Sequence, residues 1–494
     1  MLLKKFTEAM LNNSKIPIEI NIKKYLGDLY VVLFVLLLGA IFGIVCAFMG
    51  ASVAERPVLF AALPVLIGLG LTFYINPKML VAVIILLRAA ADPIFENARF
   101  GNLTGLGGMV NLAIIAIALT LVLKDPKRLP RQVWWAWLPF LCLQFIGLLH
   151  APDAYPEARQ LLAQVSTFAM FVAAFYLVDD LPSMERALRL ILGSSVPVMI
   201  ISIVYLLNGN SYSSLNGAET VSERYAGPFP HPNILAFYTN LIIALNLYLI
   251  KRGGNYLMSW KVLWSILYIM ILLVVLYSTK TRSAWIAAAV LFGIYGVLFE
   301  RRYLLYLCLI PAVAMLIPEF RDRIFDLTQG NVAIQYARLN SFAWRQLAWQ
   351  DGLQWMEPIR YFFGYGNGGF FFYYPMFNSM GGKVNFGAHN VLVQLFFDVG
   401  VFGVVAYLWL FIACFRMLRS NFRDNYMLKI FSTALLFGYF IISLSDNMLG
   451  YLTYNWYFWF FIGAACALIS RLPGQIITGI SANGIGNPLR YKPS

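Results

Sequence analysis

Long apolar runs recur along almost the whole chain, and they restrict the fold more than any other feature of the sequence. Runs of about 16 to 22 residues follow one another between Leu29 and Ser470, and a run of that length can cross the hydrocarbon core of a bilayer as a helix. With 60% hydrophobic and only 12% charged residues, the chain carries about half the charge of an ordinary soluble domain. A soluble enzyme, a disordered chain, a disulfide scaffold and a coiled coil are excluded. The sequence therefore predicts an all-α polytopic integral membrane protein.

About 14 transmembrane helices are expected, interrupted by one long hydrophilic connection. The first run resembles a signal peptide because lysines precede it, but its length favours an uncleaved anchor. Whether the short run 79–91 spans the membrane completely is left open. The expected spans are 29–50, 57–75, 79–91, 107–123, 132–149, 160–178, 190–207, 233–250, 262–278, 283–299, 303–317, 389–415, 430–450 and 454–470. The expected order of regions is a cytoplasmic segment 1–28, helices 1–11 within 29–317, a partly helical periplasmic loop 318–388, helices 12–14 within 389–470, and a flexible cytoplasmic tail 471–494.

The positions of Lys and Arg orient these spans. With the N-terminus inside, the cytoplasmic connections hold 24 of the 37 Lys and Arg residues, as the positive-inside rule requires. Membrane orientation therefore accounts for most of the formal net charge of +14, and no nucleic-acid partner is expected. The same orientation places the loop 318–388 and the starts of the eighth, tenth and twelfth spans on the outer face.

No sequence pattern indicates a metal or nucleotide site. Clustered His, Cys or acidic ligands with metal-binding spacing are absent, and no Walker or Rossmann glycine pattern occurs in a suitable context. The cysteines lie singly inside apolar runs and are interpreted as small packed hydrophobes; they are Cys46, Cys142, Cys308, Cys414 and Cys466. No cofactor is therefore expected.

Three short polar segments do not fit an ordinary bundle of apolar helices. The first, 222–233, has three prolines before the eighth span, which makes an extended approach to the membrane. It carries Arg224 and His231, and Asn233 is expected to cap the helix that follows. An arginine that merely snorkels from an ordinary loop is an equally weighted alternative.

The second segment, 278–283, places Lys280 and Arg282 in a very short outer connection between two apolar runs. Cations close to the hydrocarbon region are costly, so the pair indicates an anionic partner. Anchoring at the membrane interface is the alternative.

The third segment places His389 and Asn390 at the start of the twelfth span. An imidazole is the readiest proton acceptor near neutral pH, although a histidine at a helix start is often a cap or a packing residue. The carboxylate that would orient His389 cannot be identified from the sequence.

All three segments precede helices whose N-termini face the outer side, and each N-terminus carries partial positive charge. If the helices are neighbours, Arg224, Lys280 and Arg282 complete a cationic site that suits phosphate or pyrophosphate. A helix expected over about 340–356 in the outer loop brings Arg345 to the same face.

With these residues in view, residues from about 190 to 470 resemble the O-antigen ligase and polymerase superfamily of bacterial membrane glycosyltransferases. The resemblance rests on the order of the segments above, on Gly364-Tyr-Gly-Asn-Gly368, and on Gln394, Asp398 and Gly400. It implies a metal-independent transfer or polymerisation of an undecaprenyl-pyrophosphate-linked glycan, in lipopolysaccharide or exopolysaccharide biosynthesis. It also implies a multi-pass protein of the bacterial inner membrane with its active site facing the periplasm.

The resemblance also suggests roles for the candidate residues. The two arginines of the family fall on Arg224 and Arg282, which would stabilise the pyrophosphate leaving group. The loop histidine falls on His389, the expected general base, although a contact to the acceptor sugar is the alternative. Direct displacement would invert the anomeric carbon. The expected substrate-binding residues are Lys280, Arg345, Asn233, Asn390 and His231.

The expected partners are the lipid-linked glycan donor, a glycan or lipid A–core acceptor, and membrane lipids, with other polysaccharide-assembly proteins as further candidates. Ligase and polymerase activities are not distinguished by the sequence. The alternative function is a membrane transporter, either a flippase for lipid-linked sugars or a small-anion permease. It is less favoured because the spans are almost free of charge, whereas transporters place ionisable residues at mid-membrane.

Overall fold

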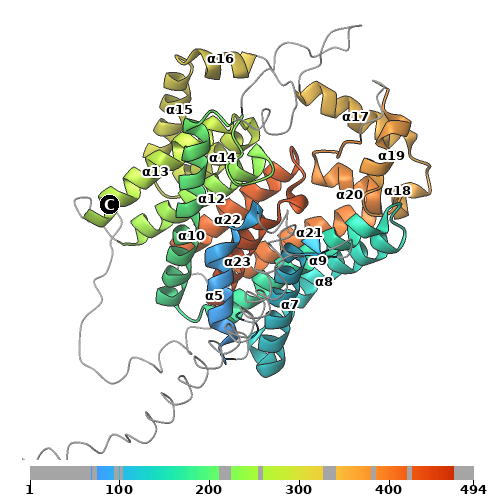
Figure 1. Cartoon of the computed structure of the whole chain (residues 1–494), viewed down its shortest axis with the longest axis horizontal. Helices are drawn as coiled ribbons and strands as arrows, with labels where there is room; N and C mark the ends of the chain where they lie inside the picture. Colours follow the sequence, from blue (N-terminus) through green and yellow to red (C-terminus); the bar gives the residue numbers. More distant parts are fainter. Residues whose placement is uncertain are drawn as a thin grey trace, which may run out of the picture. The chain divides into compact units, whose positions relative to one another are not determined.

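The chain is almost entirely helical in the computed structural model, which describes residues 68, 70, 75–93, 99–100, 104–210, 224–253, 260–325, 341–379, 385–419 and 426–471 (Figure 1). Two compact units divide it: Met1–Leu80 with Ala98–Leu103, and Val81–Asn97 with Thr104–Ser494. The expected segment 1–28, the span 29–50, most of the span 57–75 and the tail 472–494 lie outside the described residues. Within the described residues the expected all-α class is confirmed.

Most of the described elements are helices, and the two described strands have only two residues each. In chain order the elements are α5 (Pro77–Arg88), β1 (Arg99–Phe100), β2 (Thr104–Gly105), α7 (Leu106–Lys124), η1 (Pro126–Arg128), α8 (Arg131–Leu149), α9 (Ala154–Leu177), α10 (Leu181–Leu207), α12 (Pro232–Arg252), α13 (Trp260–Ser278), α14 (Arg282–Leu298), α15 (Arg302–Ala314), α16 (Pro318–Phe325), α17 (Ser341–Trp355), α18 (Arg360–Phe363), α19 (Gly369–Phe377), α20 (Val391–Val399), α21 (Val401–Arg419), α22 (Tyr426–Ser443), η2 (Met448–Gly450) and α23 (Leu452–Ser470).

Eight described helices are long and apolar enough to cross a membrane, and each overlaps an expected span. They are α7, α8, α9, α10, α12, α21, α22 and α23. Three shorter apolar helices, α13, α14 and α15, coincide with the expected spans 262–278, 283–299 and 303–317. The protein is therefore a multi-pass membrane protein, while the total of about 14 spans stays a prediction.

One expected span is wrong in its extent. The run 389–415 was expected to form one helix, but the structure has α20 and α21 separated at Gly400, where φ is +76°. A Cβ at Gly400 would collide with the carbonyl of Phe362, so the loop backbone approaches the chain closely at this break. Hydropathy could not reveal the break because apolar residues continue on both sides of it.

Helix α23 forms the centre of the bundle. Every residue from Thr453 to Ile469 is buried, as is typical of a helix that is apolar on all sides. It approaches α9 closely at Gly463, where a Cβ would collide with the carbonyl of Phe171. The indole of Trp456 donates to the Ser166 hydroxyl of α9 at 2.9 Å. The helix is thus fixed both by close backbone packing and by buried hydrogen bonds.

Helices α17, α19 and α20 pack around an aromatic core. Helix α17 confirms the helix expected over about 340–356, and residues 364–368 are not helical, with α19 beginning at Gly369. Phe370 and Tyr374 of α19 are buried against Phe397 of α20, with α17 packed over them. This core holds α17 and α19 close to the start of α20, where His389 is located.

Candidate active site

Arg224 joins two of the three segments that the sequence singles out. Its Nε donates to the carbonyl oxygen of Thr279 at 3.0 Å. Its Nη2 donates to Asn233 Oδ1 at 2.7 Å and to Thr281 Oγ1 at 3.0 Å. The guanidinium is therefore half-buried between the start of α12 and the turn that leads into α14.

The turn between α13 and α14 carries the two expected cations. The Tyr225 amide donates to the carbonyl of Ser278 at 3.3 Å and fixes the turn to the segment of Arg224. Lys280 has φ +50°, in the left-handed region that usually holds glycine after a helix. A lysine there is strained by roughly 1–2 kcal/mol, and such strain is common at functional sites. Arg282 is the first residue of α14 and is half-buried.

The N-cap of α12 differs from the expected one. His231, and not Asn233, occupies the cap, because its Nδ1 accepts from the Asn233 amide at 3.1 Å and Pro232 is the first helical residue. Proline is well suited to that position because its nitrogen has no hydrogen to leave unpaired. The side chain of Asn233 is thereby available for a different contact.

Asp446 receives that contact and links the segments into one site. Its Oδ2 accepts from Asn233 Nδ2 at 2.5 Å, and its Oδ1 accepts from the Tyr451 hydroxyl at 2.7 Å and from the Asn447 amide at 2.9 Å. The residue is fully buried. It was expected inside the span 430–450, but α22 ends at Ser443, so Asp446 lies in the turn before α23. An acidic residue within an apolar run is the sequence signal that could have identified it.

His389 lies beside this carboxylate. Its Nδ1 is 3.4 Å from Asp446 Oδ1, and its side chain is 30% exposed whereas that of Asp446 is 1% exposed. The imidazole thus has one edge against a buried acid and another accessible from outside. His389 has φ +49°, and Asn390 caps α20 by accepting from the amides of Leu392 and Val393. His389 is therefore not the cap of its helix.

Arg345 of α17 adds a cation close to Asp446. Its Nη1 donates to the carbonyl of Ser445 at 2.7 Å. Burial alone would raise the pKa of Asp446, but the hydrogen bonds from His389 and Tyr451 and the charge of Arg345 outweigh it and lower the pKa below its ordinary value. Asp446 is therefore an anion that balances nearby cations.

The glycine-rich turn lies outside this cluster and has an anchoring role. The amides of Gly368 and Phe370 donate to the two carboxylate oxygens of Asp398, at 3.1 and 2.9 Å, and Gln394 Nε2 donates to the same carboxylate at 2.7 Å. The Asn367 amide donates to the carbonyl of Gly147 on α8 at 3.0 Å. These bonds attach the glycine-rich turn to α8 and α20. Gln394 and Asp398, on which the resemblance partly rests, therefore hold this turn in place.

The cluster combines what transfer from a phosphorylated donor requires. His389 offers a proton acceptor oriented by Asp446, and Arg224, Lys280 and Arg282 stand at the starts of α12 and α14, where the helix N-termini add positive charge. Among the described residues, no three His, Cys, Asp or Glu side chains form a group that could hold a metal ion.

Comparison with known families supports the same conclusion. Residues 267–408 match the family whose description is O-Antigen ligase. This segment of the chain is similar to the O-antigen ligase and polymerase superfamily. This superfamily points to a membrane glycosyltransferase of the ligase or polymerase type. A search of curated proteins gives no match.

The matched segment contains Lys280, Arg282, Arg345, His389 and Asn390, together with the glycine-rich turn. Arg224, Asn233, His231 and Asp446 lie outside it, so their inclusion in the site of this O-antigen ligase relative rests on the geometry alone.

Proposed function

We propose that the protein transfers or polymerises a glycan carried on undecaprenyl pyrophosphate, on the periplasmic face of the bacterial inner membrane. The observation that supports this best is the unbroken series of contacts from His389 through Asp446, Asn233 and Arg224 to Thr281. It unites a base, a buried acid and a cationic turn from three distant segments of the chain.

His389 acts as the general base. With the Nδ1 proton directed at Asp446, Nε2 presents a lone pair to the hydroxyl of the acceptor sugar. The acceptor oxygen attacks the anomeric carbon, its proton passes to His389, and the bond between that carbon and the pyrophosphate oxygen breaks. The electron pair leaves with the pyrophosphate. Attack from the opposite side inverts the anomeric carbon.

The cations stabilise the leaving group. Arg282 and Lys280 contact the pyrophosphate from the start of α14, and Arg224 fixes the turn that carries them while adding its own positive charge. Because these groups are held in place before the reaction, they stabilise developing negative charge without reorganisation. Arg345, His231, Asn233 and Asn390 shape the substrate site, and no cofactor takes part. Donor and acceptor are both glycans, so ligation and polymerisation use the same chemistry.

A variant of Arg282 tests the proposal most directly. In proteoliposomes supplied with undecaprenyl-pyrophosphate-linked glycan and acceptor, Arg282→Ala should lower the rate of transfer by about 10²–10³-fold, the usual effect of removing one such charge-stabilising contact. Arg282→Lys should recover little activity, because an ammonium lacks the planar fork that binds two phosphate oxygens.

The matched control is Arg301→Ala, an exposed arginine in the turn between the end of α14 and the start of α15. It should retain wild-type transfer. Near wild-type transfer by Arg282→Ala would show that Arg282 serves only as a membrane anchor and would overturn the proposed donor site.

A further inference from the structure

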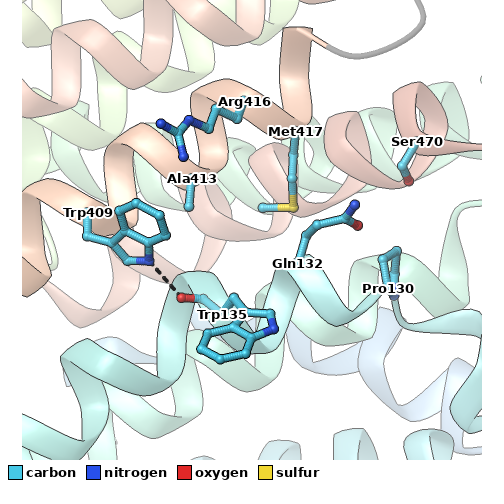
Figure 2. Close-up of a pocket in the computed structure, with 8 residues that line it drawn as sticks. All are labelled: Pro130, Gln132, Trp135, Trp409, Ala413, Arg416, Met417 and Ser470. Carbon is cyan, nitrogen blue, oxygen red and sulfur yellow. Dashed lines mark hydrogen bonds between the residues drawn. The ribbon is translucent and has the colours of Figure 1, made fainter.

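A groove of about 520 Å³ lies between the start of α8, the second half of α21 and the end of α23 (Figure 2). Helix α21 follows α20 and reaches the groove at its last turn, and α23 starts near Asp446 and reaches it at Ser470. Helices of this length span roughly 28 Å, so the groove and the candidate active site lie at opposite membrane boundaries. Its lining residues are Pro130, Gln132, Trp135, Trp409, Ala413, Arg416, Met417 and Ser470.

One wall of the groove presents a cation on a fixed aromatic support. The Arg416 guanidinium lies 5.4 Å from the centre of the Trp409 ring, an attractive arrangement for a cation and an indole. Trp409 is itself held, because its Nε1 donates to the carbonyl of Trp135 at 2.8 Å, as Figure 2 shows. Arg416 is exposed, so its charge is available at the rim.

The groove continues into an apolar surface that faces outward. The indole of Trp135 is 70% exposed, and the same two helices carry further exposed apolar side chains, Leu138 on α8 and Ile412 and Phe415 on α21. Tryptophan and arginine together are typical of the level of lipid headgroups, with aliphatic side chains deeper in the bilayer. A ligand bound here would therefore meet charge at one end and apolar surface at the other.

We propose that this groove binds an anionic phospholipid of the leaflet remote from the active site. Its phosphodiester pairs with Arg416 through charge-assisted hydrogen bonds, and its acyl chains lie along Trp135, Ile412 and Phe415. The volume falls within the range of small-molecule sites, roughly 300–1,000 Å³. Arg131, the first residue of α8, strengthens the attraction to a negative headgroup. This proposal is independent of the glycan-transfer reaction.

Native mass spectrometry of the purified full chain tests the site, with phosphatidylglycerol and phosphatidylcholine as the two probes. The wild-type protein should retain phosphatidylglycerol in preference to phosphatidylcholine. Arg416→Gln should weaken phosphatidylglycerol retention by about fivefold or more, because a charge-assisted contact is replaced by a neutral one. Arg419→Gln is the matched control: it removes an exposed arginine from the same last turn that does not line the groove, and it should change retention less than twofold.

A second variant tests whether the lipid occupies the volume of the groove, independently of its contact with Arg416. Gln132 lines the groove and is exposed, so Gln132→Trp should fold normally, fill the groove and also reduce phosphatidylglycerol retention. Equal retention of the two lipids by the wild-type protein would overturn the proposal. Equal effects of Arg416→Gln and Arg419→Gln would overturn it as well, since the site would then be a diffuse basic surface.

Discussion

At the scale of single residues, the buried carboxylate of Asp446 gives the candidate base its orientation. It accepts hydrogen bonds from Asn233 and Tyr451 while lying 3.4 Å from His389 Nδ1. A buried anion in that position selects the tautomer that leaves Nε2 unprotonated, and it stabilises the imidazolium once the proton has been taken. Asp446 is thus expected to act on the reaction through His389.

Substitutions at this pair should separate a base from a structural contact. His389→Gln should lower the single-turnover rate of transfer by about 10²–10⁴-fold and remove one ionisation from the acidic limb of the pH–rate profile. Asp446→Asn should cause a loss of similar size.

Tyr451→Phe is the matched control, since it removes one hydrogen bond to Asp446 but keeps the carboxylate. It should retain most of the activity and the wild-type pH profile. If His389→Gln keeps the acidic limb and loses only affinity for the acceptor, His389 binds the acceptor sugar and the base lies elsewhere.

At the scale of elements, the cap of α12 makes the fold sensitive to acid. His231 Nδ1 accepts the Asn233 amide, which only the neutral imidazole can do. Burial, and then the charge of Arg224, lower the pKa of His231 to about 4 from an ordinary 6.5. As pH falls below about 6.5, His231 of the unfolded chain binds a proton, whereas His231 of the folded protein stays neutral until about pH 4. The free energy of unfolding therefore falls as pH drops from about 6.5 to about 4, by roughly 3 kcal/mol, and is unaffected by His231 above that window.

His231→Ser tests this effect, because serine caps helices well but does not titrate. The variant should match the wild type in thermal unfolding at pH 7.5 and lose less stability than the wild type between pH 7 and pH 4.5. An equal loss in both proteins would assign the acid sensitivity to other groups.

Most helices and turns of the fold could be predicted from the sequence, but one helix break could not. The positions of the helices were predicted from the long apolar runs, because the length of a membrane span is a property of the local sequence. The turn with Lys280 and Arg282 and the loop helix near Arg345 were likewise predicted from local charge and pattern. The break at Gly400 was not, because it depends on the close approach of the backbone at Phe362.

Two parts of the site depend on tertiary contacts in the same way. His231 replaces Asn233 as the cap because Asn233 Oδ1 accepts from Arg224 and Asn233 Nδ2 donates to Asp446, while the backbone amide of Asn233 donates to His231. The partnership of Asp446 with His389 joins residues 57 positions apart. No local pattern could specify either arrangement.

At the scale of the whole molecule, basic residues gather at the helix ends remote from Asp446. Arg128 and Arg471 both donate to the carbonyl of Phe175, which joins the start of α8 to the ends of α9 and α23. Lys251 and Arg252, at the end of α12, pair with Glu300 and Glu185. Since the N-terminus of α12 lies in the active-site cluster, these basic ends lie at the opposite membrane boundary. The positive-inside rule then predicts that they face the cytoplasm and that the cluster faces the periplasm.

Labelling of introduced cysteines from outside intact cells tests this orientation, after the native cysteines have been replaced by alanine. Glu357→Cys, exposed in the outer loop, should react with a membrane-impermeant maleimide. Gly253→Cys and Arg419→Cys, both exposed at the basic ends, should react only after the membrane is permeabilised. Because a glycan donor flipped to the outer leaflet reaches only one face, the position of Glu357 decides whether the site can meet it. Labelling of Gly253→Cys in intact cells, with protection of Glu357→Cys, would place His389 and Arg282 in the cytoplasm and exclude the periplasmic transfer proposed for them.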